Sequence, residues 1–178
     1  MRKLFFFLGS FILFNTINAQ TIVLKVDGIK GESDKAKFSD KTELLGVVME
    51  GSSSQGSATG GGMAVGKRSY QPIIILKQTG ASSPLLFQSF FTGKHIKEIV
   101  IEYYKTDNKT GAQILDYSLT LKNVIITGFK QFAGPLKNER FDPANDNLLC
   151  DEIKFNFQEI IAEYKKGGII VQDNIISR

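Results

Sequence analysis

The chain has 178 residues, of which 42% are hydrophobic and 22% charged, with 22 basic against 18 acidic residues. This length suits one domain that buries about 70% of the surface its unfolded chain would expose. The two signs of charge are mixed along the chain without a basic stripe interleaved with aromatic residues, which argues against nucleic-acid binding.

The first 19 residues have the organisation of a secretory signal peptide. Arg2 and Lys3 are positive, Leu4 to Phe14 form an apolar run, and Ala19 places a small residue before a possible cleavage site. The run is shorter than the roughly 20 residues of a transmembrane helix, so a retained interfacial anchor is the alternative. We expect export to the periplasm or the medium, and a single mature domain over residues 20–178 without membrane contact.

Short strand-like segments follow, each ended by turn-forming residues. Thr21–Val26 ends at Asp27-Gly28, and Leu44–Glu50 runs into a tract rich in glycine and serine. Tyr70–Lys77 contains Pro72, which cannot donate a ladder hydrogen bond and so indicates the start of a strand or the edge of a sheet.

The glycine tract contains GGGMAVGKR, one residue short of a P-loop pattern because Arg68 stands where Ser or Thr would bind magnesium. A P-loop needs a buried strand before its glycines and a helix after them. Here a polar tract precedes the glycines and the strand-like Tyr70–Lys77 follows, so we expect no phosphate site.

One helix is predicted over Ser83–Thr92. Ser83 suits the N-cap and Pro84 the first helical position, while Gly93 suits the left-handed turn that ends a helix. Four apolar residues share one helical face, which we expect to cover the core: Leu86, Phe87, Phe90 and Phe91.

Alternation of apolar and polar residues is clearest in the second half of the chain. Glu98–Lys105 and Ile114–Lys122 flank a turn sequence and predict a hairpin. In Ile153–Gln158 the odd-numbered positions are apolar and the even-numbered ones polar, as in a strand with one dry face. A break in phase at Val124–Ile126 predicts a bulge or a bend. These patterns favour a mainly β fold, a two-sheet antiparallel barrel with one flanking helix and a long glycine-rich loop.

Residues with catalytic or metal chemistry are scarce. His95 is the only histidine, so a two-histidine metal site cannot form within the chain. Cys150 is the only cysteine and is expected to be a small buried apolar residue. The acidic stretch FDPANDNLLCDE lacks calcium-loop spacing and predicts a solvated loop. We expect no enzymatic activity, no metal and no cofactor.

Four segments carry a family resemblance when taken in order: Val26–Ser33, Ser83–Ile101, Tyr117–Phe129 and Glu152–Lys165. Together they resemble the Hcp family, the haemolysin-coregulated tube proteins of the type VI secretion system. The resemblance implies barrel subunits that form homo-hexameric rings, and rings that stack into a tube driven out of the cell by a contractile sheath. It also implies secretion-system components as partners and small effectors held in the ring lumen.

If the chain assembles as this resemblance implies, we expect the glycine tract to be an extended arm that contacts a neighbouring subunit or ring. The alternative is that the tract is disordered. Its predicted contact residues are Gly60, Gly61, Gly62, Met63, Val65, Lys67 and Arg68. The leader departs from the family pattern, so a second hypothesis is an exported monomeric β-barrel that binds a glycan or a protein. A third, a P-loop enzyme, would need nucleotide contact at Lys67.

Overall fold

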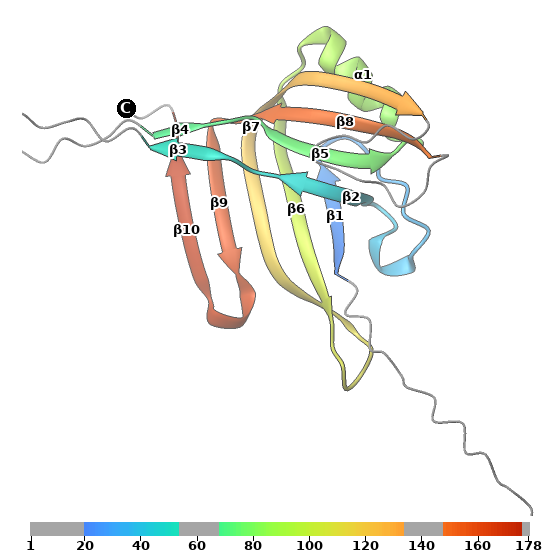
Figure 1. The fold of residues 1–178 in the computed structure, drawn as a ribbon, viewed down its shortest axis with the longest axis vertical. Helices are drawn as coiled ribbons and strands as arrows, with labels where there is room; N and C mark the ends of the chain where they lie inside the picture. The colour runs from blue at the N-terminus through green and yellow to red at the C-terminus, as the bar shows by residue number, and fades with distance from the viewer. Residues whose placement is uncertain (1–19, 54–67, 134–147, 176–178) are drawn as a thin grey trace, which may run out of the picture.

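The computed structural model describes residues 20–53, 68–133 and 148–175, most of them in antiparallel strands (Figure 1). Six strands follow one another around a closed barrel in the order β7-β6-β1-β2-β5-β8, and β8 pairs again with β7. Their bounds are β1 (Thr21–Val26), β2 (Thr42–Val48), β5 (Ile73–Gln78), β6 (Ile96–Thr106), β7 (Gln113–Ala133) and β8 (Leu149–Asn156). The predicted β-barrel is confirmed. The division into two sheets is not, because pairing joins these strands into one continuous sheet.

Two further strands extend the sheet beyond the barrel. β9 (Glu159–Tyr164) pairs with the first half of β7, and β10 (Ile169–Asn174) pairs with β9. The turn η2 (Lys165–Gly167) joins them, and Gly168 follows it with φ of +61°. β3 (Gly51–Ser53) and β4 (Arg68–Tyr70) form a separate ribbon that lies near one end of β10 (Figure 1).

β7 shapes the barrel because it is 21 residues long and serves different neighbours in turn. Its first half pairs with β6 and β9, and its second half pairs with β8. Between the halves, Asn123 has φ of +51° and the register shifts between Ile126 and Gly128. The predicted break at Val124–Ile126 is therefore a bend and a bulge that carry the strand around the barrel.

The barrel interior follows the predicted period of two. Ile153 and Phe155 of β8 are fully buried, whereas Lys154 and Asn156 between and after them are more exposed. Burial of each such apolar side chain stabilises the fold by about 1.5–3 kcal/mol relative to exposure to water. Cys150 is also fully buried, as predicted, and packs in a small apolar cluster.

The helix α1 (Ser83–Thr92) has the predicted bounds, and Gly93 ends it with φ of +63°. The predicted cap was wrong: Ser82 is the N-cap residue and makes no side-chain cap hydrogen bond. Ser83 lies one position further in, where its hydroxyl is bonded to Lys77 and Asp151 of the barrel wall. Among the described residues, no helix combines the length and apolar character needed to cross a bilayer.

The predicted apolar face of α1 is only partly buried. Leu86 is fully buried, but Phe87 is 49% exposed and Phe91 is 82% exposed. The buried positions are spaced three apart along one narrow stripe: Ser83, Leu86 and Ser89. Phe87 lies beside this stripe and packs edge-on against Phe129 of β7, with ring centres 5.2 Å apart. The error arose because four apolar residues span a wider arc than the barrel covers.

The acidic stretch FDPANDNLLCDE was misread as a solvated loop at its end, while its residues 141–147 lie outside the described residues. Its last two carboxylates lie within β8, where Asp151 is fully buried and Glu152 nearly so. Asp151 accepts hydrogen bonds from Thr79 at 2.8 Å and Gln131 at 3.0 Å, and its carboxylate lies 3.5 Å from the ammonium of Lys77. Partners distant in the chain therefore make its burial possible.

Candidate assembly surface

The last strand of the sheet exposes an apolar edge. Ile169, Ile170 and Val171 of β10 are 59%, 62% and 63% exposed. Within the described part of the chain β10 is paired as a strand with β9 alone, and the two strands project past the barrel (Figure 1). Because none of the described elements covers either face here, successive side chains are exposed without alternation. A strand edge of this kind is a template for pairing with another chain.

The ribbon of β3 and β4 is fastened beside this edge. The hydroxyl of Tyr70 in β4 donates a hydrogen bond of 2.7 Å to the carboxylate of Asp173 in β10. The Tyr70 ring also lies 5.9 Å from that of Phe157, at the junction of β8 and β9. The base of the glycine-rich tract is thus held next to β10.

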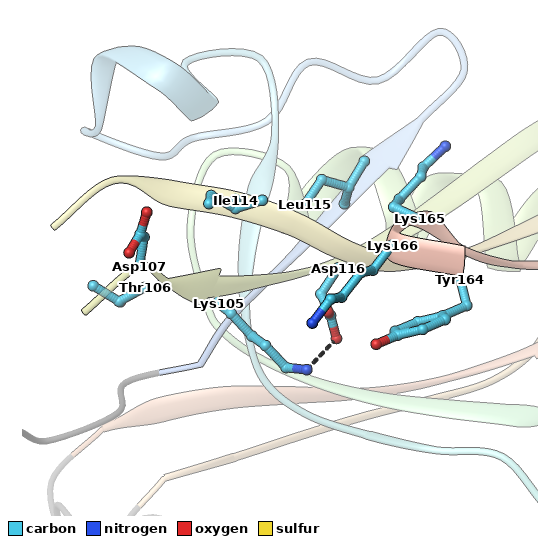
Figure 2. Close-up of a pocket in the computed structure, with 9 residues that line it drawn as sticks. All are labelled: Lys105, Thr106, Asp107, Ile114, Leu115, Asp116, Tyr164, Lys165 and Lys166. Carbon is cyan, nitrogen blue, oxygen red and sulfur yellow. Dashed lines mark ion pairs between the residues drawn. The ribbon is translucent and has the colours of Figure 1, made fainter. Parts of the chain in front are cut away.

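A pocket of about 520 Å³ opens where the β6–β7 and β9–β10 hairpins end (Figure 2). Inside it, the ammonium of Lys105 lies 2.5 Å from the carboxylate of Asp116. The hydrogen bond from this pair raises the pKa of Lys105, and nearby Tyr164 adds to the effect. Figure 2 also shows Lys165 and Lys166 projecting to opposite sides of the turn η2.

A second pocket, of about 380 Å³, lies at the start of β2 and is lined by three carboxylates and one lysine, Lys35. Glu32, Asp34 and Glu43 line it together with Leu45, which is 48% exposed. Burial alone would raise the pKa of Glu43, but hydrogen bonds from Lys35 and Ser33 outweigh it and hold that pKa below its ordinary value. This side of the molecule therefore combines carboxylates with an exposed aliphatic group.

Ser83 of α1 has polar neighbours like those of a catalytic nucleophile, but its hydroxyl is buried and a substrate cannot reach it. Ser83 Oγ lies 2.7 Å from Lys77 Nζ, and both residues are buried. The ammonium already faces Glu32 at 2.9 Å, so it is a cation held in an ion pair rather than a base. No group of three or more His, Cys, Asp or Glu side chains within the described ranges is arranged to hold a metal ion.

Comparison with known proteins identifies the fold and the family. The family model described as "Type VI secretion system effector, Hcp" matches residues 23–164. The chain belongs to the Hcp family. A curated relative, the "Major exported protein" of Pseudomonas aeruginosa, is 25% identical over 114 residues, which cover 64% of this chain and 63% of that protein.

Solved Hcp structures share the architecture at low sequence identity. Hcp1 of Escherichia coli EAEC 042 aligns with a TM-score of 0.67 and 23% identity, covering 88% of this chain and 97% of that one. Hcp3 of Pseudomonas aeruginosa gives 0.65 and 16%, covering 90% and 100%. Hcp1 of Flavobacterium johnsoniae gives 0.54 and 13%, covering 86% and 99%. These likenesses establish the Hcp fold.

Most of the predicted arm residues of this Hcp-family chain lie outside the described residues: Gly60, Gly61, Gly62, Met63, Val65 and Lys67. Only Arg68 is described, as the first residue of β4. A strand thus follows the glycines where a P-loop requires a helix. Sequence reasoning missed β10, although an apolar triplet after Gly167-Gly168 is a usable hairpin signal.

Proposed function

We propose that this Hcp-family protein is a structural subunit that assembles with copies of itself into rings of six, which stack into a tube. The observation that supports this most directly is the exposed apolar edge of β10. The barrel strands have their pairing satisfied by closure, so β10, outside the barrel, is where the sheet can accept another strand. Assembly through an exposed strand edge requires no catalytic residues.

Ring assembly follows from how such contacts repeat. A head-to-tail contact between copies closes into a ring when its rotation permits, and a second contact between rings extends them into a filament. The glycine-rich arm, with Gly60 to Gly62, Met63, Val65, Lys67 and Arg68 as contacts, is suited to the second contact. Its base is held beside β10 through Tyr70. Secretion-system components and small effectors in the lumen are the further partners we propose.

Light scattering and negative-stain microscopy on the purified protein test the assembly. Rings are expected at high concentration, and Ile170→Lys should abolish them because it places a charge in the edge contact. Phe91→Lys, at an even more exposed position on α1, is the matched control and should leave the rings intact. A protein that stays monomeric at every concentration would refute the proposal.

Residues 1–19 are proposed to be a cleaved leader that directs the mature domain out of the cytoplasm. Mass spectrometry of the protein from the periplasm and the medium would then find a chain that starts near Gln20. Recovery of the intact chain in the cytoplasm, with Met1 retained, would show that the leader is not used.

The pocket in Figure 2 favours one alternative, an exported monomer that binds a glycan or a protein. Its volume falls within the range of small-molecule sites. Saturable binding of an acidic glycan by a monomer, lost in Lys105→Ala, would support this alternative over ring formation.

A further inference from the structure

We propose that neighbouring copies meet head to tail, with the lysine-bearing side of one copy against the carboxylate-bearing side of the next. The lysine surface comprises Lys165, Lys166, Ile169, Ile170 and Val171. The carboxylate surface comprises Glu32, Asp34, Glu43 and Leu45. This inference rests on the proposed self-assembly and names the surface that β10 meets.

The two surfaces lie at opposite edges of the molecule. In the strand order β10-β9-β7-β6-β1-β2-β5-β8, closed by pairing of β8 with β7, the lysine surface occupies the β10 end and β2 lies three strands from β7 in either direction around the barrel. The carboxylate surface lies at the start of β2 and in the turn before it, across the molecule from β10 (Figure 1). Patches on opposite edges are what a repeating head-to-tail contact requires, because each copy offers one of them to either neighbour.

Charge on the lysine surface is available to a partner. Lys165 pairs with Glu163 at 2.5 Å, but both side chains are about one-third exposed, and such surface pairs are weak. Lys166 is exposed and forms no ion pair with any other described residue. Beyond this turn come the three exposed aliphatic side chains of β10, so a partner meets positive charge next to an apolar strip.

The carboxylate surface has the complementary composition. Asp34 is exposed and, across the described ranges, has no ion-pair partner. Glu32 and Glu43 are paired with Lys77 and Lys35 respectively, which largely balance their charges. The unbalanced negative charge of this surface is therefore that of Asp34. Leu45 supplies the exposed aliphatic contact beside them.

Complementary charge also decides the orientation of the contact. Two lysine surfaces brought face to face would repel each other, and so would two carboxylate surfaces. Electrostatic complementarity selects register and rejects wrong partners more than it adds affinity. The pattern therefore disfavours a symmetric dimer and favours the lysine-to-carboxylate contact, which propagates around a ring.

Charge reversal tests the pairing through two exposed residues that hold no described ion pair. Lys166→Glu and Asp34→Lys should each weaken assembly at least about tenfold at low salt, because each sets like charges against one another. The double variant K166E/D34K restores the attraction with the signs exchanged. It should assemble to within about threefold of the unaltered protein.

Mixing the two single variants adds a stricter test. Lys166→Glu keeps an intact carboxylate surface, and Asp34→Lys keeps an intact lysine surface. When the two variants alternate, the intact surfaces attract each other at one contact, and Glu at 166 attracts Lys at 34 at the next. The mixture should assemble better than either variant alone. Lys94→Glu, an exposed lysine after α1, is the control and should have no effect.

The outcomes separate this inference from the proposed function. If the unaltered protein forms rings and both single reversals form them equally well, the pairing is refuted while ring assembly stands. Failure of the double variant to recover, with its thermal melt unchanged, also refutes the pairing. If the unaltered protein forms no rings, both proposals fall.

Discussion

Replacing Lys77 with methionine should cost the fold about 3–5 kcal/mol, because it leaves the buried carboxylate of Asp151 without its cation. The ammonium is fully buried and lies 3.5 Å from Asp151 and 2.9 Å from Glu32. It also donates hydrogen bonds of 2.7 Å to the Ser83 hydroxyl and the Gln78 carbonyl oxygen. Methionine fills nearly the same space, so the loss is electrostatic rather than a packing defect.

This loss is a large share of the stability of an ordinary domain, about 5–15 kcal/mol. At about 2–4 °C per kcal/mol for a domain of this size, the midpoint of thermal unfolding should fall by roughly 6–20 °C. Urea unfolding followed by circular dichroism measures the free energy directly. Lys25→Met is the matched control: Lys25 is exposed on β1 and should change stability by less than about 0.5 kcal/mol.

A double-mutant cycle then isolates the ion pair. Adding Asp151→Leu to Lys77→Met removes both charges, so the double variant should lose less than the sum of the single losses by about 1–3 kcal/mol. The reasoning would be refuted if Lys77→Met cost under about 1 kcal/mol, or if the two losses were additive.

Three further predictions concern packing and ionisation. Leu86→Ala should cost about 2–5 kcal/mol and Phe91→Ala under about 0.5 kcal/mol in urea unfolding, since one side chain is fully buried and the other mostly exposed; equal losses would contradict the observed face of α1. Gly31→Ala should lower the melting midpoint, because its Cβ would lie 2.1 Å from the Lys41 carbonyl carbon, and an unchanged midpoint would contradict this close approach. Burial, with a smaller effect from a neighbouring tyrosine, raises the pKa of Tyr103 to about 12. The unfolded chain ionises this group near 10, so stability should fall as pH rises from about 10 to 12. Phenolate absorbance compared with Tyr103→Phe checks this, and ionisation of Tyr103 near pH 10 in the folded protein would contradict it.

The sequence predicted correctly the elements whose ends are set by neighbouring turn residues. Thr21–Val26 and Ser83–Thr92 have the predicted bounds because turn residues or a glycine end them. The phase break near Val124 marked the bend of β7 because an extra residue shifts every later side chain to the other face. Tyr70–Lys77 is not one strand, because Pro72 separates β4 from β5, but β5 starts directly after Pro72, as the proline indicated.

Contacts between distant segments could not be predicted in this way. Asp151 was expected in solvent because its sequence neighbours are polar, yet the cation beside it comes from β5, 74 positions earlier. Closure of the barrel through β7 and β8 depends on a register that no single segment encodes. The exposed strand β10 was not predicted either, because its pairing with β9 and its lack of cover depend on the rest of the sheet.

The exposed apolar edge of β10 needs protection from unspecific pairing. An exposed apolar strand is a risk for any secreted protein, since chains can pair through it without limit. Here closure protects the barrel strands, yet β9 and β10 extend outward, and three aliphatic side chains remain exposed on the last strand. Lysines beside an apolar edge are a common device against unspecific pairing, and Lys165 and Lys166 occupy that position. In the head-to-tail contact proposed above, the same two lysines would also choose the carboxylate-bearing partner.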